Sequence, residues 1–428
     1  MSAPGEDAGL LGEPRECAAE YREALAWLYG LQIYGIKLGL ENMLQLCEAL
    51  DVDLHSGAKR KFVHVAGTNG KGSVCALIGA ICCASGVRTG VYTSPHLVSF
   101  RERIRLGPNL IPERDVVDLV ARIRTMTAAW EHSPTFFEVT TAMALAWFQH
   151  QRAEWVILET GLGGRLDATN VVTPAVSVLT PIGFDHQQHL GDTLAAIAAE
   201  KAGIIKPGVP VISAPQPPEA EEVFQSVAKE RGARIKFLKT PITDSWTLAL
   251  TGSHQRMNAA VAFASLISAG LRPDPREVGQ AFARVEWPGR FQSVWNGRII
   301  LDGAHNAAAA QRLVQTWREE FGDEKATLVL GVLRDKDVRA VCAPLLEIAK
   351  WVICAPVRSP RALDPNDLAE IVRGMANVPC TTVENLSAGL QQARQHEERA
   401  LVAGSLFLVG EALVELGLAT GAHEWSAQ

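Results

Sequence analysis

Short apolar runs alternate with longer amphipathic stretches along the first two thirds of the chain. The apolar runs have the length of buried strands and lie at 62–66, 90–94, 155–159, 176–180, 210–213 and 235–238. The stretches with helical character lie at 74–85, 112–130, 136–150, 191–203 and 252–269. Strands that alternate with helices in this way are typical of a parallel sheet covered by helices.

The alternation is interrupted at 287–292, where a helix ends and Pro288 and Gly289 intervene. A second series of apolar runs follows at 298–302, 326–331, 351–354 and 400–404, separated by helical stretches at 306–320, 337–348, 365–375, 386–397 and 405–416. The pattern therefore predicts two α/β domains, 1–287 and 288–428. We expect a P-loop-type, mostly parallel sheet flanked by helices in the first and a smaller Rossmann-like α/β fold in the second.

The composition is that of a globular protein, with 47% hydrophobic and 21% charged residues in a chain of 428. The net charge of −6 argues against nucleic acid or an anionic membrane as the main partner. Eight cysteines without a C-x-x-C spacing favour reduced, structural thiols. The N-terminal stretch lacks the basic and apolar segments of a secretory signal, so we expect a cytoplasmic location, and we expect a monomer.

A glycine-rich turn follows the first predicted strand. It consists of Gly67, Thr68, Asn69, Gly70, Lys71, Gly72 and Ser73 and leads into an apolar helix. Glycines allow backbone conformations in which successive N–H groups point at an anion, and a helix N-terminus adds partial positive charge. The spacing differs from the usual G-x-x-x-x-G-K-[ST], because Gly72 separates the lysine from the hydroxyl. The strand before and the helix after nevertheless favour a phosphate site over a turn without a ligand.

Three further predicted strands end in side chains that can bind a metal ion, Ser94, Glu159 and His186. Because the carboxyl ends of parallel strands meet at one edge of a sheet, these side chains should lie near the phosphate turn. Oxygen and nitrogen donors beside a nucleotide suit Mg²⁺, although each residue alone is more often a simple hydrogen-bonding group. The glycines after Glu159 lack the strand, turn and helix context of a dinucleotide fingerprint.

Other polar residues have two interpretations each. Lys201 near a helix end can simply compensate the helix dipole. The polar residues that open the helix at 252–269, Asn258 among them, suit either phosphate and ribose contacts or capping. The turn at 302–306 follows the first buried apolar strand of the second domain and is a second candidate ligand edge.

Seven segments together resemble one enzyme family. They are Gly67–Ser73, Thr93–Leu97, Leu158–Asn170, Asp185–His186, Glu200–Lys206, Pro288–Arg290 and Leu301–Asn306. In order and spacing they resemble the folylpolyglutamate synthase/dihydrofolate synthase family of Mur-type ATP-dependent amide ligases, from about Gly35 to Leu416. The chain departs from the family pattern at Asn42, where Arg is common, and at Ala307, where Pro is usual.

The resemblance implies a role for each matching residue. It implies that Thr68 to Lys71 bind ATP phosphates, and that Asn258, Arg290 and Asp302 complete the ATP site across the domain boundary. Ser94, Glu159, His186 and a carboxylated Lys201 would bind Mg²⁺, as two ions. The implied catalytic residues are Lys71, Lys201, Arg290 and His305. The implied pteroate contacts are Lys37, Leu38, Gly39, Leu40, Thr135, Phe136, Phe137, Glu138, Leu166, Asp167 and Ala168.

The activity that the resemblance implies is ATP-dependent ligation of L-glutamate to dihydropteroate, to the γ-glutamyl tail of tetrahydrofolate, or to both. The carboxylate would be activated as an acyl phosphate, and ADP and phosphate would be released. A nucleotide-dependent switch would need the Asn-Lys-x-Asp of GTPases, which the sequence lacks. A Mur-type ligase for a peptidoglycan precursor is the remaining alternative. The carboxylates of the incoming glutamate would be held by residues of the C-terminal domain, His305 among them.

Overall fold

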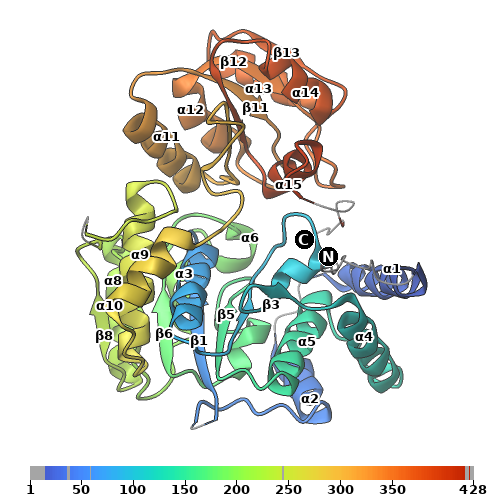
Figure 1. Ribbon diagram of the computed structural model, residues 1–428, viewed down its shortest axis with the longest axis vertical. Coiled ribbons are helices and arrows are strands. Elements are labelled where there is room, and N and C mark those ends of the chain that lie inside the picture. Colours follow the sequence, from blue (N-terminus) through green and yellow to red (C-terminus); the bar gives the residue numbers. More distant parts are fainter. Residues whose placement is uncertain (1–14, 36–38, 58, 243–244, 420–423, 425–428) are drawn as a thin grey trace, which may run out of the picture.

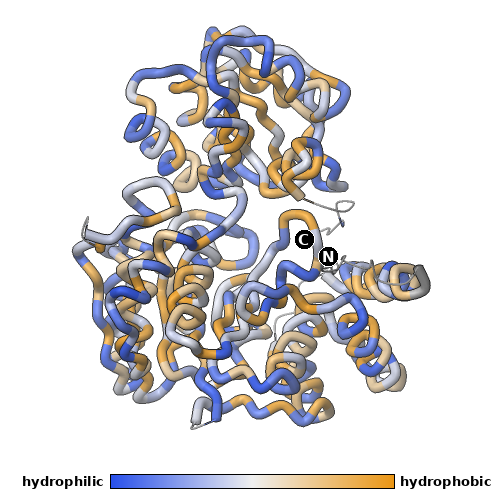
Figure 2. Tube along the Cα trace, viewed as in Figure 1, coloured by the Kyte–Doolittle hydropathy of each residue, from blue (hydrophilic) through white to orange (hydrophobic). Residues whose placement is uncertain are grey.

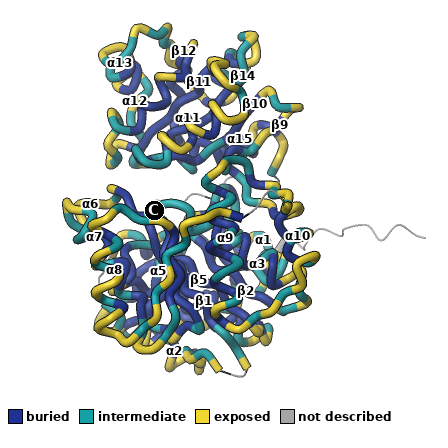
Figure 3. The backbone as a smooth tube through the Cα atoms, turned by 90° about the vertical axis from the view of Figure 1, so that its left-hand side faces the viewer, coloured by how far each residue is buried: buried dark blue, intermediate teal, exposed yellow. Residues whose placement is uncertain are grey.

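The computed structural model describes residues 15–35, 39–57, 59–242, 245–419 and 424. They form two lobes, one above the other in Figure 1. The N-terminal lobe contains an eight-stranded sheet and the C-terminal lobe a six-stranded sheet. Both sheets are buried, and most of the exposed backbone lies on the surrounding helices and loops (Figure 3).

The sheet of the N-terminal lobe is parallel except at one edge. Its strands lie in the order β4 (Asn109–Leu110), β3 (Ile104–Leu106), β2 (Thr89–Tyr92), β5 (Trp155–Glu159), β1 (Lys61–Ala66), β6 (Val176–Leu179), β7 (Val211–Ser213) and β8 (Ile235–Phe237). All neighbours from β2 to β8 pair in parallel, whereas β3 and β4 add an antiparallel hairpin. The segments that follow β1, β2, β5 and β6 therefore meet at one edge.

Helices cover both faces of this sheet. On one face pack α1 (Arg15–Gly30), α2 (Glu41–Ala49), α4 (Glu113–Thr127), α5 (Phe136–His150), α7 (Leu194–Ala202) and α8 (Pro218–Glu230). On the other pack α3 (Lys71–Ala84), α9 (Ser253–Ser268) and α10 (Pro275–Arg284). Because side chains alternate along a strand, Phe62 of β1 packs among the helices of the first face, whereas Val63 and Val65 pack among those of the other face. This two-sided burial explains the continuous apolar runs of the sequence.

The C-terminal lobe repeats this architecture. Its strands lie in the order β13 (Cys380–Thr382), β12 (Ala349–Cys354), β11 (Ala326–Leu330), β14 (Arg399–Ala403), β10 (Ile299–Leu301) and β9 (Gln292–Val294), with only β9 antiparallel. One face packs against α11 (Ala307–Phe321), α12 (Val338–Ile348) and α13 (Pro365–Met375). The other packs against α14 (Leu386–Ala393) and α15 (Leu406–Glu415).

The expected fold class is confirmed. The predicted strand at 155–159 and helix at 136–150 have the predicted bounds as β5 and α5. The strands β3, β4, β9 and β13, of two or three residues each, were not predicted. In the part of the chain that the structure describes, no helix is long and apolar enough to cross a membrane.

Candidate active site

A cavity of about 500 Å³ is lined by residues of both lobes. It adjoins the carboxyl edge of the N-terminal sheet, since Gly67, Ser94, Glu159 and His186 all line it. Every site residue predicted from the sequence that the structure describes lines this cavity, with the exception of Leu40. Lys37 and Leu38 lie outside the described residues. The structure therefore brings together segments that are far apart in the sequence.

The phosphate turn has the backbone that its glycines predict. Gly70 caps α3 with a φ of 88°, in the left-handed region. Gly67 has a φ of 150°, and a Cβ there would lie 1.8 Å from the Thr180 hydroxyl oxygen. A side chain is therefore excluded at both positions for conformational reasons, and at Gly67 also by contact. The helix begins at Lys71, three residues before the predicted stretch at 74–85, so its first N–H groups lie within the turn.

The Lys71 ammonium group folds back over this turn. Its Nζ donates hydrogen bonds to the carbonyl oxygens of Gly67 at 3.2 Å and Thr68 at 3.3 Å. Asn258 from α9 lies beside Gly70, and its amide donates to Gln255 Oε1 at 2.9 Å. The turn thus combines a cation, a helix N-terminus and a neighbouring amide, which suits an anionic ligand.

Glu159 provides a buried carboxylate at the end of β5. Its side chain is almost fully buried, and Oε2 accepts a hydrogen bond from the Ser94 N–H at 3.1 Å. Burial raises the pKa of Glu159, while the charges of Lys71 and Arg290 act in the opposite direction. A buried carboxylate that has no direct ion pair with any described residue is well suited to a bound cation.

Lys201 is buried at the end of α7 and is only 5% exposed. The interpretation as a solvated charge at a helix end is therefore wrong. The pKa of Lys201 is lowered to about 7, mainly by burial and also by the positive charge of Lys71. Asp185 and Asp167 oppose this shift. Much of the Lys201 amine is consequently neutral, and hence nucleophilic, near neutral pH.

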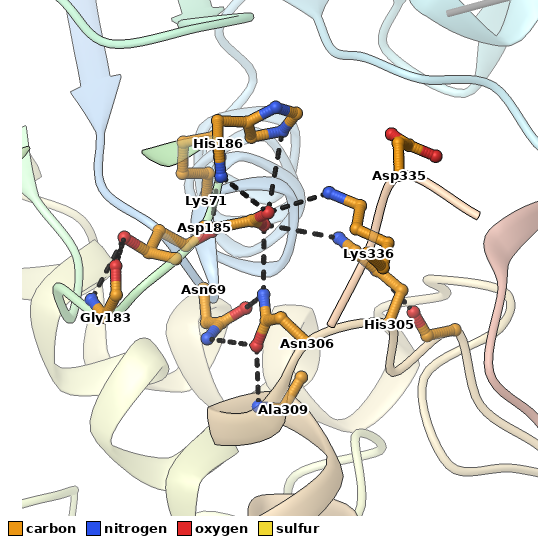
Figure 4. Close-up of polar contacts among 12 residues, drawn as sticks. Asn69, Lys71, Gly183, Asp185, His186, His305, Asn306, Ala309, Asp335 and Lys336 are labelled. Atoms are coloured by element: carbon orange, nitrogen blue, oxygen red, sulfur yellow. Dashed lines mark hydrogen bonds and ion pairs between the residues drawn. The ribbon is translucent and has the colours of Figure 1, made fainter. Parts of the chain in front are cut away.

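Asp185 lies at the centre of a polar network between the lobes (Figure 4). Lys336 Nζ donates to Asp185 Oδ1 at 2.7 Å, and Asn306 Nδ2 donates to Oδ2 at 3.1 Å. The imidazole of His305 lies 3.7 Å from Oδ2 and that of His186 lies 3.8 Å from Oδ1. Burial alone would raise the pKa of Asp185, but the surrounding histidines and Lys336 hold it below its usual value.

The side chains of Asn69 and Asn306 pair across the lobes. Asn69 Nδ2 donates to Asn306 Oδ1 at 3.2 Å, and Asn306 Nδ2 donates back to Asn69 Oδ1 at 3.1 Å. Asn306 also caps α11, because its Oδ1 accepts from the Ala309 N–H at 2.9 Å. The phosphate turn is thereby joined directly to the first helix of the C-terminal lobe.

Several predicted pteroate contacts have structural roles as well. Thr135 and Glu138 form a capping box on α5, with the Thr135 N–H donating to Glu138 Oε2 at 2.7 Å. Phe136 is 2% exposed and stacks on Tyr29 with ring centroids 5.7 Å apart. Most of the Phe136 ring therefore belongs to the core. Phe137 is the less buried of the two rings and lines the cavity beside Gly161.

Asp167 organises the glycine-rich loop after β5. Its Oδ2 accepts from the Leu162 N–H at 2.8 Å, and its Oδ1 accepts from the N–H and the hydroxyl of Thr169. The Thr169 hydroxyl also lies 2.8 Å from His64 Nε2 in β1. Burial raises the pKa of Asp167, and these donors oppose the shift. Asp167 thus fixes the loop whose neighbours Leu166 and Ala168 also line the cavity.

Residues that the sequence interpretation missed belong mainly to the wall formed by the C-terminal lobe. They include Lys336, Arg312, Arg361, Ser405 and Phe407, together with Asp185 of the N-terminal lobe. Asp185 directly precedes His186, so its place next to a predicted metal ligand could have identified it as a site residue. The others lie in loops or on helices without a distinctive local pattern.

The described residues contain no group of three or more His, Cys, Asp or Glu side chains arranged to bind a metal ion. The predicted set contains only two such residues, Glu159 and His186, with Ser94 and Lys201 as the other members. Lys201 would repel a cation here as an ammonium group and would attract one as a carbamate.

Comparisons with known proteins define the class first. The model of the Mur ligase middle domain matches residues 65–217, and that of the Mur ligase, glutamate ligase domain matches residues 289–406. A dihydrofolate synthase/folylpolyglutamate synthase of Bacillus subtilis is 31% identical and aligns with 91% of this chain and 98% of its own length. The chain belongs to the dihydrofolate synthase/folylpolyglutamate synthase family.

Solved structures agree with this assignment. The Escherichia coli FolC structure in complex with DHPP and ADP has a TM-score of 0.84 at 31% identity, covering 95% of this chain and 99% of its own. The Yersinia pestis folylpolyglutamate synthase/dihydrofolate synthase complexed with AMPPNP and Mn ion has a TM-score of 0.83 at 31% identity, covering 95% and 100%. The chain is therefore an ATP-dependent carbon–nitrogen ligase of this family, and the alternative of a peptidoglycan-precursor ligase is wrong.

Proposed function

We propose that this protein ligates L-glutamate to dihydropteroate, to the γ-glutamyl tail of tetrahydrofolate, or to both, at the expense of ATP. The observation that supports this most directly is the single cavity that joins the phosphate turn, Glu159 and the loop around Asp167. A pteroate carboxylate bound against that loop would face the phosphate turn. The domain at 1–287 would bind ATP and pteroate, and the domain at 288–428 would be the glutamate-ligase domain.

The residues of the cavity suit phosphoryl transfer followed by amide formation. The substrate carboxylate takes the γ-phosphoryl group of ATP and becomes an acyl phosphate, and the neutral amine of glutamate then displaces phosphate. Lys71 and Arg290 stabilise the negative charge that develops on the transferred group. Asn258 and Asp302 complete the nucleotide site from α9 and from the turn after β10. The catalytic role that we propose for His305 rests on its position beside Asp185.

Divalent cations fit the donors at this edge. We propose that Ser94, Glu159 and His186 hold Mg²⁺ and that a carboxylated Lys201 is a ligand of a second ion, since a buried carboxylate suits such ions. Bound Mg²⁺ would neutralise phosphate charge. The Ser94 N–H orients the Glu159 carboxylate by a hydrogen bond, and the positive charge of Lys71 stabilises its ionised form.

The environment of Lys201 supports its proposed carboxylation. A neutral buried amine can add CO₂ to give a carbamate and a proton, and the lowered pKa of Lys201 favours the neutral amine. The product places a negative charge next to Lys71, where an ammonium group would be repelled. The modification would thus place an anion near the Lys71 cation, while the charges of Asp185 and Asp167 oppose it.

The incoming glutamate carries two carboxylates that need cationic partners. Lys336 and Arg361 line the wall that the C-terminal lobe contributes, and Arg361 Nε is buried without a hydrogen-bond partner in the described structure. We propose these two side chains, with His305, as the groups that hold glutamate. The monomeric state and the cytoplasmic location remain predictions from the sequence.

The decisive experiment is a substrate panel. ADP release would be measured with dihydropteroate and with tetrahydrofolate, each with and without L-glutamate. Release that requires a pterin substrate and glutamate together supports the proposal, and the active substrate shows which ligation occurs. No glutamate-dependent release with either pterin would contradict it, provided that ATP binding is shown separately.

A further inference from the structure

One loop of the N-terminal lobe connects the proposed metal site with the C-terminal lobe. It begins at Ser94, whose N–H donates to Glu159. Its tip, Leu97 and Val98, packs in the hydrophobic cluster of the C-terminal lobe that contains Val409 of α15. In Figure 1 the loop rises from the lower lobe towards α15, and Figure 2 shows its apolar tip. The loop is therefore buried against the lobe that closes the cavity.

The backbone of this loop is held by two carboxylates, Glu102 of the same segment and Glu424, which is 324 positions from Phe100. Glu102 accepts hydrogen bonds from the N–H groups of Leu97, Val98 and Ser99 at 2.8, 3.0 and 2.8 Å. The next N–H, that of Phe100, donates to Glu424 Oε2 at 2.5 Å. Glu424 thus completes a run of four consecutive backbone donors, each satisfied by a carboxylate oxygen.

Glu424 makes further contacts on both sides of the loop. Its Oε2 also accepts from Ser99 Oγ and from the Tyr21 hydroxyl of α1, each at 3.2 Å. Its backbone N–H donates to the Val98 carbonyl oxygen at 2.8 Å. One residue from beyond α15 is therefore joined to the loop by its side chain and by its backbone.

His96 extends this contact towards the interior. Arg103 Nε donates to His96 Nδ1 at 2.8 Å, so Nδ1 is an acceptor and Nε2 carries the proton. His96 Nε2 donates that proton to the Glu424 carbonyl oxygen at 2.9 Å. The imidazole is held between a buried guanidinium and Glu424, two residues away from Ser94.

We propose that Glu424 is a positioning residue for the ligase reaction, because it fixes the segment from His96 to Phe100 and thereby holds Ser94 at the metal and phosphate edge. The inference rests on the proposed role of Ser94 as a metal ligand. The loop therefore has two anchors, α15 of the C-terminal lobe and Glu424. Its packing against α15 couples the metal edge to the apposition of the lobes.

The test compares Glu424→Gln with Glu415→Gln, a matched variant at an exposed position of α15. Loss of a charged acceptor should speed amide exchange at Phe100 about tenfold in Glu424→Gln. The Mg²⁺ concentration for half-maximal ADP release should rise about three- to tenfold, because the ordered state of the loop is less populated. The rate at saturating Mg²⁺ should stay within about twofold of the parent, and Glu415→Gln should match the parent throughout.

Two further variants make the outcome decisive. Tyr21→Phe removes one donor to the same oxygen and should shift the Mg²⁺ requirement in the same direction by a smaller factor. If Glu424→Gln and Tyr21→Phe both leave the Mg²⁺ requirement unchanged, Glu424 does not position the site. Ser94→Ala tests the proposed function separately: an unchanged Mg²⁺ requirement there overturns the metal role of Ser94, whatever the Glu424 variants show.

Discussion

The two walls of the cavity are built differently. On the N-terminal wall, local backbone fixes each side chain: Lys71 folds onto its own turn, and Glu159 ends a central strand beside the Ser94 N–H. On the C-terminal wall, Lys336 and Asn306 are fixed by partners in the other lobe, Asp185 and Asn69. The first wall is therefore preorganised for chemistry, whereas the second is assembled when the lobes meet.

This difference predicts distinct consequences for substitutions. Changes on the N-terminal wall should abolish turnover and leave the lobes together. Changes on the C-terminal wall should affect lobe apposition and stability first and the chemical step second. Each substitution below tests whether this division holds.

The largest effect is expected at Lys71. Lys71→Ala removes the cation from the phosphate turn, and ligation should fall by about 10³-fold or more, since phosphoryl transfer depends on such charges. Thermal unfolding should change little, because the ammonium group bonds only to carbonyl oxygens of its own turn in the contacts described here. ADP release and a melting curve measure both, with Lys229→Ala at an exposed position of α8 as the control. Turnover close to the parent rate would remove Lys71 from the chemistry.

Lys201 should follow, with a loss of about 10²-fold on substitution by arginine. Arginine keeps the positive charge but is always protonated, so it can neither form a carbamate nor coordinate a cation. Lys201→Ala should be partly restored by short carboxylic acids in the buffer, and mass spectrometry of the intact protein under gentle conditions should detect the added carboxyl group. A fully active Lys201→Arg protein would show that the N-terminal wall works without a carboxylated lysine.

Sequence reasoning reached the first wall because its features are local. A glycine turn between a strand and a helix, and polar residues at strand ends, place Lys71 and Glu159 before any tertiary contact is known. The pairing of Lys336 with Asp185 joins residues 151 positions apart, and neither lies in a pattern that predicts the other. Phe136 illustrates the opposite difficulty: at the first turn of a helix, the sequence did not distinguish a ring in the cavity from a ring in the core.

The C-terminal wall is tested by Asp185→Asn. The variant leaves Lys336, whose side chain is 10% exposed, without its charged partner, which should cost about 3 kcal/mol of unfolding free energy. The pKa of Asp185 is lowered on folding, so its stabilisation is present above the unfolded pKa of about 4 and is lost as the pH falls below it. The free-energy difference between parent and variant should therefore be constant at neutral pH and shrink in acid.

Asp335→Asn is the matched control, because Asp335 pairs with Arg361 in a more exposed position next to Lys336. Small-angle scattering with an ATP analogue, Mg²⁺ and a pteroate should show a more open average shape for Asp185→Asn than for this control. Identical scattering profiles and an unchanged free energy of unfolding would mean that the Asp185 network does not hold the lobes together.

The smallest effect is expected at Thr169, which is hydrogen-bonded to Asp167 in the glycine-rich loop after β5. The Thr169 hydroxyl donates to Asp167, so it must accept from His64 Nε2, which leaves the buried His64 Nδ1 as a bare acceptor. Thr169→Val removes the middle of this chain, and the unpaired donor and the weakened loop should cost about 1–2 kcal/mol. Because Asp167 retains its bonds to the backbone N–H groups, the loop should loosen without unfolding. The KM for the pterin substrate should therefore rise about threefold while kcat is unchanged.

The control is Thr127→Val, which alters a buried hydroxyl of α4 that is bonded only within its own helix in the contacts described. It should change neither constant. A fall in kcat for Thr169→Val would instead place this chain of hydrogen bonds on the chemical side of the N-terminal wall.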